Sequence, residues 1–284
     1  ASSSTCARPR TDPRTHQRQP HIERRLDLPR ARQIACQKPC HPRSLSALFP
    51  FGHSPNPMIH CIGIGPGDPD YLTLKGHRLI SEADVVAGFD AVVDIIRPFI
   101  KPTAEIITMG YKDQPAQLEK VAARHHDGRT CVVVFMGDLH FSGFQLLERV
   151  EHACGHGVPA VPGISSAQLM AEATRTCFDE TTFLTFHRRG DIEPFKTHLA
   201  SLLKQGRNAI IIPRPWDFMP HHITTWLIEN GVDSHLVLEV AENLSRRDAR
   251  WTGTLSTCPD HFSDMCIMLI RGGPAFPSQI DFSK

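Results

Sequence analysis

A repeated alternation of apolar runs, glycine-bearing loops and amphipathic segments begins at Met58, and it constrains the fold more than any other feature of the sequence. Four of the apolar runs, each too short for a typical helix, are IHCIGI (59–64), ADVVAG (83–88), EIITMG (105–110) and TCVVVFM (130–136). Such runs are typical of parallel strands buried on both faces, which need crossover helices between them. We therefore predict an α/β lobe with a mostly parallel sheet over residues 58–172.

The second half of the chain has a different pattern. Its strand-like runs lie at 181–189, 208–215, 235–244, 249–256 and 265–271. Only two clear helix patterns accompany them, near 193–205 and 218–230. The last three runs follow one another without room for crossover helices, so we expect their strands to pair antiparallel. We predict a second α/β lobe with a mixed sheet over residues 173–284, a linker near 172–181, and a ligand cleft between the two lobes.

Residues 1–57 differ from the rest in composition. They carry ten Lys/Arg against three Asp/Glu and nine of the 23 prolines, whereas the remainder carries 21 Lys/Arg against 27 Asp/Glu. Such a segment cannot bury enough apolar surface to offset its ordering entropy, so we predict a disordered basic leader. A basic arm that binds nucleic acid or a membrane and an organelle-targeting peptide are alternatives, although the prolines would break the helix of a targeting peptide. Because Met58 stands directly before the first strand, we interpret residues 1–57 as an upstream extension that is not native.

The composition also argues against several classes of protein. No run of 18 apolar residues is present, so no membrane span is predicted. The six cysteines after residue 57 are scattered and no secretory signal is visible, which favours reduced thiols and a cytoplasmic location. Cys36, Cys40 and His41 have no second ligand pair at zinc-like spacing, so we expect no metal site. The charge of about −6 on residues 58–284 argues against a nucleic-acid partner.

The loop GIGPGDPD follows the first apolar run and is not a conventional phosphate-binding loop. A dinucleotide fingerprint has glycines at its first, third and sixth positions, and the following helix N-terminus faces the pyrophosphate. Here the glycines are Gly63, Gly65 and Gly67, and Asp68 occupies the sixth position. The Asp68 carboxylate would repel a phosphate, and Pro66 lacks a backbone N–H.

Two further glycine loops, FMGDLHFSG (135–143) and VPGISSAQ (161–168), also follow apolar runs. In an open α/β sheet the C-terminal ends of parallel strands gather at one crevice, where ligands bind. Together the three loops offer carboxylates, backbone groups and hydroxyls. S-adenosylmethionine fits such a site because it has a sulfonium, an ammonium and a ribose but no phosphate. The alternative is that each glycine merely turns the chain.

The loops also carry a family resemblance. The stretch IGIGPGDPDYLTLKGHRLISEADVVAG (62–88) resembles the opening motif of the tetrapyrrole (corrin/porphyrin) methyltransferases. FMGD is similar to the Gly-Asp-Pro cofactor loop of that family, and PGISS to its Pro-Gly-Ile/Val-Ser-Ser turn. The resemblance spans roughly residues 58–272. Within the family, PGISSAQLMAEA, LTFHRRGD and AENLSRRDARWTGTLS are most similar to the precorrin/cobalt-precorrin-7 C5-methyltransferases of cobalamin biosynthesis.

This resemblance implies a homodimeric, two-lobed enzyme with the tetrapyrrole methylase fold. It would bind S-adenosylmethionine and methylate C5 of a corrinoid precursor, either cobalt-precorrin-7 or its cobalt-free equivalent. In some relatives a domain for C15 methylation and decarboxylation is fused at the C-terminus. For this chain we expect a separate C15-methyltransferase/decarboxylase as pathway neighbour.

Two departures from the family pattern affect the loops. Leu139 replaces the proline of Gly-Asp-Pro, and His140 follows where glycine is common, which would stiffen or reshape the loop. Arg188 replaces the glycine of His-Gly-Arg. Neither change removes a group that the chemistry requires, but both leave the identity of the substrate open.

Methyl transfer from a sulfonium needs an aligned carbon nucleophile more than a general base, so no catalytic triad is expected. Positioning alone can supply roughly 7 to 11 kcal/mol. His187 is a candidate for orienting the substrate or shuttling a proton, with a structural role as the alternative. The predicted cofactor-binding residues, carried over from the motifs, are Pro66, Gly137, Asp138, Leu139, Phe141, Ser165, Ser166 and Leu184. One of the two serines would cap a helix while the other reaches the ligand, and a solvated turn position is the alternative for Asp138.

The carboxylates of a corrinoid substrate require guanidinium or ammonium partners. The predicted substrate-binding residues are Arg188, Arg189, Arg214, Asp68 and Tyr71, with Lys112 and Arg246 as weaker candidates. Any one of these arginines can instead be an ordinary surface charge.

Other functions stay open at this point. A same-fold enzyme could methylate another tetrapyrrole position, an RNA ribose or a protein. A nicotinamide-dependent oxidoreductase would need phosphate contacts at the first glycine loop, which Asp68 opposes. A non-catalytic binding module would not need three ligand-type loops.

Overall fold

The computed structural model describes residues 58–246 and 249–273. The expected leader, including Cys36, Cys40 and His41, lies outside these residues. Within the described ranges, no helix is long and apolar enough to cross a membrane. The same ranges contain no group of three His, Cys, Asp or Glu side chains arranged to hold a metal ion, and their six cysteines are free thiols.

The first sheet consists of five parallel strands in the order β3-β2-β4-β1-β5. Its strands are β1 (Ile59–Gly63), β2 (Val85–Phe89), β3 (Glu105–Met109), β4 (Cys131–Phe135) and β5 (Ala160–Val161). The helices that connect them are α1 (Leu74–Glu82), α2 (Asp90–Ile96), α3 (Gln114–His126) and α4 (Phe144–Cys154). The predicted parallel sheet with crossover helices is confirmed.

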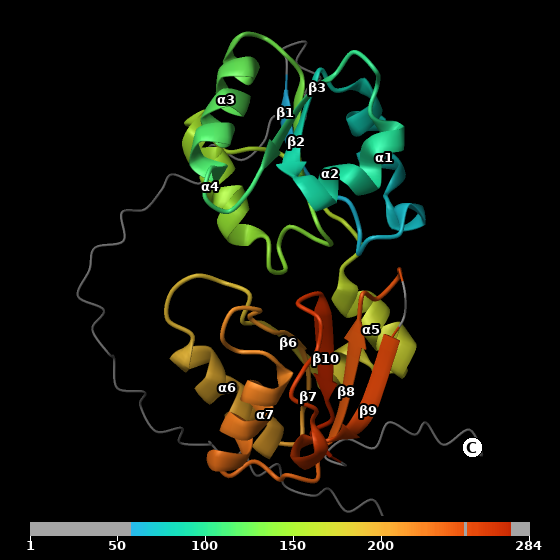
Figure 1. The fold of residues 1–284 in the computed structure, drawn as a ribbon, viewed down its shortest axis with the longest axis vertical. Helices are drawn as coiled ribbons and strands as arrows, with labels where there is room; N and C mark the ends of the chain where they lie inside the picture. Colours follow the sequence, from blue (N-terminus) through green and yellow to red (C-terminus); the bar gives the residue numbers. More distant parts are fainter. Residues whose placement is uncertain (1–57, 247–248, 274–284) are drawn as a thin grey trace, which may run out of the picture. The chain divides into compact units, whose positions relative to one another are not determined.

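Helices cover both faces of this sheet, with α1 and α2 on one face and α3 and α4 on the other (Figure 1). Alternate residues of β1 serve the two faces, since Ile59 and Cys61 pack with α3 and α4 while Ile62 packs with α1 and α2. Both faces are therefore apolar, which explains the continuous hydrophobic runs of the sequence.

The second sheet is mixed, with the order β6-β7-β10-β8-β9. Its strands are β6 (Thr181–Thr185), β7 (Asn208–Ile212), β8 (Val237–Glu242), β9 (Ala249–Thr254) and β10 (Cys266–Ile270). β6 and β7 pair parallel, and the other neighbours pair antiparallel. The predicted mixed sheet is confirmed.

The predicted antiparallel pairing of the last three strands is confirmed, although β10 pairs with β8 and β7 and not with its neighbour in sequence, β9. The last strand passes β9 and inserts between β7 and β8. Burial explains this order: all five residues of β10 (CIMLI) are buried, whereas none of the residues of β9 (ARWTGT) is buried. A strand that is apolar on both faces gains most in the centre of a sheet, and a polar strand is suited to its edge.

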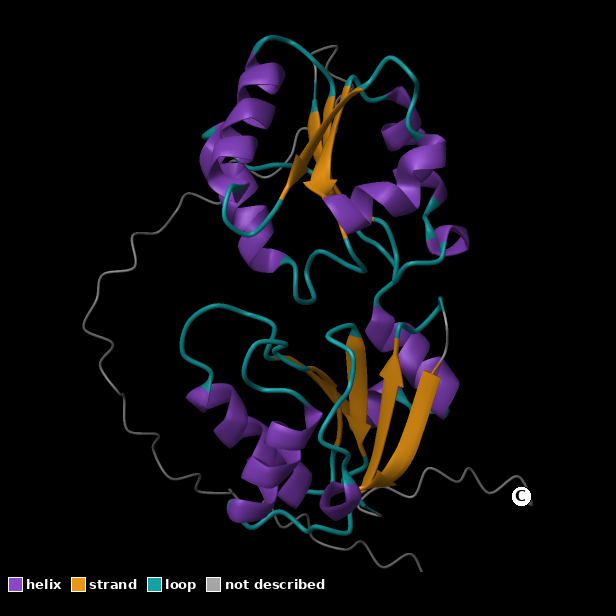
Figure 2. Cartoon of the chain, viewed as in Figure 1, coloured by secondary structure: helices purple, strands orange, loops and turns teal. Residues whose placement is uncertain are grey.

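Three helices cover the second sheet: α5 (Ser166–Thr174), α6 (Glu193–Lys204) and α7 (Pro220–Glu229). α6 and α7 pack on one face, and α5 packs on the other against β7 and β10 (Figure 2). The expected lobe boundary between residues 172 and 173 falls inside α5. α5 buries Met170 and Ala171 against the second sheet, so this helix packs with the second lobe.

Candidate functional site

The ends of β1, β4 and β5 meet at three glycines. A Cβ atom added to Gly63 would lie 2.6 Å from the Gly137 carbonyl oxygen and 2.7 Å from the Gly163 nitrogen. Non-bonded atoms in contact normally lie about 3.5–4.0 Å apart, so no side chain fits at Gly63. The loops after the three strands are thus in direct backbone contact, which only glycine permits. We call the contact of Gly63, Gly137 and Gly163 the glycine junction.

Gly65 extends the contact between the first two loops. Its N–H donates to the Gly137 carbonyl at 3.3 Å, and the Gly137 N–H donates back to the Gly65 carbonyl at 2.7 Å. Both residues have positive φ, +90° at Gly65 and +65° at Gly137, a conformation that side chains rarely tolerate. The first and second loops therefore hold each other in one fixed shape.

Asp138 joins the second loop to the third. One carboxylate oxygen accepts a hydrogen bond from the His140 N–H at 2.8 Å, and the other accepts from the Gly163 N–H at 3.0 Å. The side chain is only 17% exposed. Asp138 is therefore a structural brace of the glycine junction as well as a candidate ligand contact, because each carboxylate oxygen keeps a second lone pair.

Ser165 is the serine that caps a helix. Its hydroxyl accepts from the Ala167 N–H at 3.2 Å, while the Gln168 side chain accepts from the Ser165 N–H at 2.7 Å. This capping box begins α5 and places Ser166 at its first residue. Of the two predicted serines, Ser166 is thus the one not used as the cap.

The first loop packs against residues 243–246. Of these, only Arg246 was predicted from the sequence, as a weaker candidate for substrate binding. The Asp68 N–H donates to the Ser245 hydroxyl at 3.1 Å, and a Cβ on Gly67 would lie 2.7 Å from Cδ of Arg246. Asn243 and Ser245 have positive φ, +49° and +76°. Strained backbone of this kind often marks functional sites. The turn Asn243–Arg246 therefore belongs to the surroundings of the glycine loops.

The other predicted residues of the first loop differ in exposure. Pro66 is buried, and Tyr71 is 40% exposed. The Asp68 side chain accepts from the Asp70 N–H at 3.0 Å and so begins the short 3-10 helix Pro69–Tyr71. Asp68 is thus occupied in shaping the loop.

Three predicted cofactor residues are apolar and lie partly in the cores. Leu139 is fully buried among α3, α4 and the first sheet, and Leu184 is buried under α6 and α7. Both side chains are therefore largely covered by protein. Phe141 is half-buried against the α5 face, with its ring centroid 6.3 Å from that of Phe183.

The predicted arginines have unlike surroundings. The Arg188 guanidinium lies 4.2 Å from the Phe195 ring centroid, and its buried Nε has no hydrogen-bond partner among the described residues. Arg189 is exposed. The Arg214 guanidinium is bound by the Asp217 carboxylate, with one N–O distance of 2.9 Å. Asp217 thus largely neutralises Arg214, whereas Arg188 keeps an unsatisfied donor.

His187 is half-buried at the end of β6. Burial lowers the pKa of its imidazole below the usual 6.5, so the ring is neutral near pH 7. Its ring centroid lies 5.6 Å from that of Trp216. A neutral imidazole can orient a substrate or accept a proton, and both predicted roles remain available to it.

Two side-chain bridges connect the second glycine loop to the loop that carries His187. The Ser142 and Thr185 hydroxyls lie 3.1 Å apart. The Gln145 amide pairs with the backbone of Arg189, with distances of 2.9 and 3.2 Å. No sequence motif indicated these bridges, because each joins polar residues about 43 positions apart in the chain.

The structure brings most of the predicted residues into two groups. The glycine junction gathers Gly137, Asp138 and Ser165 with the first loop, and the His187 loop gathers Arg188, Arg189 and Arg214. Lys112 lies on an exposed turn and Arg246 against Gly67. Sequence reasoning missed Ser142, Gln145, Thr185, Trp216 and Ser245.

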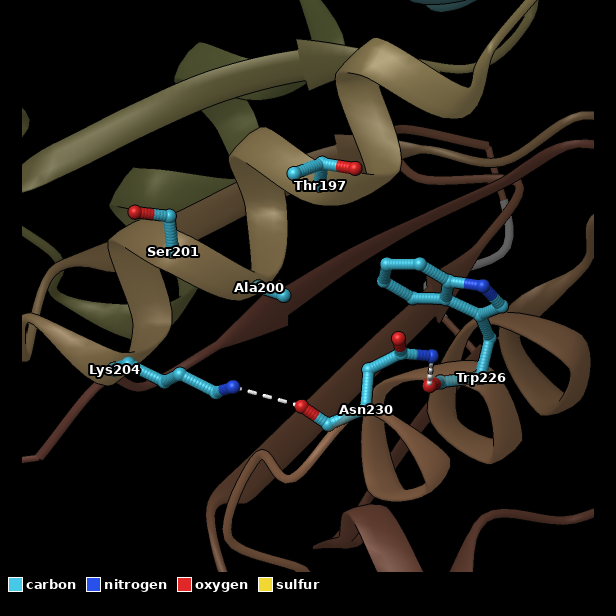
Figure 3. A pocket seen from close by; sticks show the side chains of 6 residues that line it. All are labelled: Thr197, Ala200, Ser201, Lys204, Trp226 and Asn230. Carbon is cyan, nitrogen blue, oxygen red and sulfur yellow. Dashed lines mark hydrogen bonds between the residues drawn. The ribbon is translucent and has the colours of Figure 1, made fainter.

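Two hollows on the second lobe lie away from these residues. One, of about 360 Å³, lies between α6 and α7, where the Lys204 Nζ donates to the Asn230 carbonyl at 2.7 Å beside Trp226 (Figure 3). The other, of about 380 Å³, is lined by residues that include His221 and Asp260. Neither hollow contains a predicted ligand-binding residue.

The chain belongs to the tetrapyrrole (corrin/porphyrin) methylases, because the sequence profile of this family matches residues 58–259, more than half of the chain. The members of this family are methyltransferases, so the chain is an enzyme of that class.

Individual relatives agree with this assignment. A probable cobalt-precorrin-7 C(5)-methyltransferase of Methanocaldococcus jannaschii is 27% identical over 66% of this chain and 84% of its own length. A cobalt-precorrin-4 C(11)-methyltransferase of Priestia megaterium is 35% identical over 45% of this chain and 52% of its own length, so the chain spans about half of that relative. The crystal structure of the methyltransferase CobJ has the same fold, with a TM-score of 0.65, 17% identity, and coverage of 76% of this chain and 94% of that one.

Proposed function

We propose that this protein is an S-adenosylmethionine-dependent C-methyltransferase that acts on a corrinoid precursor in cobalamin biosynthesis, at C5 of cobalt-precorrin-7 or of its cobalt-free equivalent. Membership of the methylase family and the similarity to the Methanocaldococcus enzyme support this proposal. One observation supports the cofactor assignment most directly: backbone N–H donors at the glycine junction already have hydrogen-bond partners within the chain.

Five N–H donors around the junction are already occupied. Those of Gly65 and Gly137 bind each other's carbonyls, that of Gly163 binds Asp138, and those of Ser165 and Ala167 belong to the capping box. An anion site at a helix N-terminus needs these donors free. Carbonyl and carboxylate oxygens keep spare lone pairs, so the junction favours a ligand with positive groups and hydroxyls over a pyrophosphate.

This donor arrangement disfavours the nicotinamide-dependent alternative. In a dinucleotide site the first glycine loop presents backbone N–H groups to the pyrophosphate. Here the Asp68 carboxylate accepts from the Asp70 N–H, and the Asp68 N–H itself donates to Ser245. The first loop is therefore closed by its own chain and by the turn Asn243–Arg246.

The bound cofactor would supply an electrophilic methyl group to a nucleophilic carbon of the substrate. In this proposal the loops of the glycine junction hold the cofactor in a fixed position through their carbonyl groups, with Asp138 and Ser166 offering further polar contacts. Arg188 and Arg189 pair with substrate carboxylates, and His187 orients the ring. Because holding the two reacting carbons in line supplies most of the acceleration, the chain needs no strong base.

The proposal also specifies which carbon of the substrate ring is methylated. The two relatives described above are named for different positions, C5 and C11, and their identities to this chain are similarly low. The local motifs PGISSAQLMAEA and AENLSRRDARWTGTLS favour C5. Incubation of the full chain with labelled S-adenosylmethionine and a panel of precorrins, with and without cobalt, tests the position through the product that carries the label.

The cofactor assignment has a direct test. Calorimetric titration of the full chain with S-adenosylhomocysteine should give a micromolar dissociation constant, and titration with NAD should give no binding heat. Heat with NAD alone would exclude the methyltransferase assignment of this site. The proposal also includes a homodimer, a cytoplasmic location and a separate C15-methyltransferase/decarboxylase, and sedimentation equilibrium tests the dimer.

A further inference from the structure

Trp216 is a large apolar side chain held in an exposed position by an ordered turn. The residue is 54% exposed. The turn is closed by two backbone hydrogen bonds between Arg214 and Phe218, of 2.9 and 3.1 Å, and by the pairing of the Arg214 guanidinium with Asp217. Phe218 is buried in the core of the second lobe. The exposure of the indole is therefore a fixed feature of a well-anchored turn rather than the result of a loose loop.

The turn lies beside the loop whose residues are proposed to bind the substrate. The Trp216 ring centroid is 5.6 Å from that of His187, and the Arg214 guanidinium carbon is 5.7 Å from the Trp216 ring centroid. Arg214 also donates to the Gly190 carbonyl at 3.5 Å, which connects the turn to the His187 loop. The loop next to the indole contains Arg188, with its unpartnered buried Nε, and the exposed Arg189.

These neighbours define the chemistry of a ligand. An exposed indole on a rigid turn offers a flat apolar face, and flat conjugated molecules stack on such faces. Guanidinium groups without carboxylate partners attract carboxylates. A ligand suited to both features is a flat conjugated ring with carboxylates on its edge.

We propose that the Trp216 indole is the surface on which the conjugated ring of the substrate stacks, and that it determines the preference of the enzyme for tetrapyrroles. This inference rests on the proposed function and deepens it, because it names the side chain that recognises the ring itself rather than its carboxylates. Trp216 contacts the substrate but not the cofactor.

The inference can be tested by porphyrin titrations of the full chain, in which the porphyrin absorbance gives the affinity and the quenching of tryptophan fluorescence reports contact with the indole. Uroporphyrin is the probe, and coproporphyrin, which has the same ring and fewer carboxylates, is the second probe. The variants are Trp216→Ala, Trp216→Phe and, as a matched control, Trp226→Phe, whose indole lines the hollow between α6 and α7. S-adenosylhomocysteine binding is measured calorimetrically for every variant.

Trp216→Ala should weaken both porphyrins by the same factor, about tenfold, which corresponds to about 1.4 kcal/mol. The factor is shared because the two probes have the same ring. Trp216→Phe should keep most of the affinity, because it keeps an aromatic face, but should lose most of the fluorescence quenching. Trp226→Phe should retain the affinity of the wild-type chain, and S-adenosylhomocysteine should bind all variants equally.

Several results would overturn the inference while leaving the proposed function intact. One is wild-type porphyrin affinity in Trp216→Ala together with normal S-adenosylhomocysteine binding. Another is loss of a dimer in Trp216→Ala with unchanged porphyrin affinity, which would make the indole a contact between two copies of the chain. Absence of S-adenosylhomocysteine binding in the wild-type chain would overturn the proposed function, and the porphyrin titrations would still decide the role of Trp216.

Discussion

Gly63→Ala is the substitution that tests the glycine junction most directly. The added methyl group would lie 2.6 Å from the Gly137 carbonyl oxygen, 2.7 Å from the Gly163 nitrogen and 2.9 Å from the Gly163 Cα. All three neighbours are backbone atoms, so no flexible side chain can move aside. The loops after β4 and β5 would have to move away from β1.

The size of the effect follows from these distances. Ordinary contact begins near 3.4 Å, so the loops must separate by most of an ångström at Gly63. Overpacking of this kind costs about 1–3 kcal/mol. The bond from the Gly65 N–H to the Gly137 carbonyl is already 3.3 Å long, and its loss costs about 1 kcal/mol more. We expect the free energy of unfolding to fall by about 2–4 kcal/mol and the melting temperature by about 5–15 °C.

The assay compares three alanine variants by thermal unfolding and by calorimetric titration with S-adenosylhomocysteine. Gly157→Ala is the control, because the nearest atom to its added Cβ is a Glu151 carboxylate oxygen 3.8 Å away. Gly137→Ala adds a Cβ in open space but imposes a side chain at φ +65°, so only a conformational cost of about 1 kcal/mol is expected. Gly63→Ala should lose the most stability and bind the ligand most weakly. If Gly63→Ala matches Gly157→Ala in both measurements, the backbone contact is not what holds the site.

The remaining predictions concern the N-cap of α5 at Ser165, the hydrogen bonds of Asp138 and the dependence of stability on pH. Ser165→Ala should lower the free energy of unfolding by about 1 kcal/mol in urea titrations, because α5 loses its N-cap, and an unchanged midpoint would contradict the capping role. Asp138→Ala should weaken S-adenosylhomocysteine at least tenfold and lower the melting temperature, since the Gly163 N–H loses its acceptor; equal affinity would remove Asp138 from the site. Burial lowers the pKa of His125 and His187 below 6.5, so the unfolded chain takes up protons first. The contribution of these two histidines to stability should therefore be constant above about pH 7 and decline as the pH falls below 6.5, and urea titrations that show no decline below pH 6.5 would refute this.

Most elements of the fold could be predicted because each depends on local sequence. The apolar runs became β1 to β4 in the predicted places, and Thr73 caps α1 through a hydrogen bond from the Gly76 N–H of 3.1 Å. The position of β10 could not be predicted from adjacency in the chain. It depends on the competition between an all-apolar β10 and a polar β9 for the centre of the sheet, and this competition involves residues distant in sequence.

The candidate site was predictable to the extent that motifs mark it. The glycines were found because a strand followed by closely spaced glycines is a local signal. The pairing of Ser142 with Thr185 and of Gln145 with Arg189 left no local signal, because each pair joins residues about 43 positions apart in the chain. The exposure of the Trp216 side chain likewise depends on a turn closed by Arg214 and Asp217. The sequence PRPWD does not by itself predict this turn.

The hydrogen bonds that Asp138 and Ser165 already make determine which ligand chemistry the glycine loops favour. Asp138 and Ser165 are the most ligand-like residues of the glycine loops, yet both already accept backbone hydrogen bonds. Asp138 accepts from the N–H groups of His140 and Gly163, and Ser165 accepts from the Ala167 N–H of α5. Their first effect is to consume donors, and a loop region whose donors are consumed presents carbonyl oxygens to its surroundings. Selectivity for a cationic, hydroxyl-bearing ligand over a phosphate then comes from the shape of the backbone as much as from the charge of Asp138. A substitution that keeps the carboxylate but moves the loops, such as Gly63→Ala, should therefore impair cofactor binding about as severely as removing the carboxylate itself.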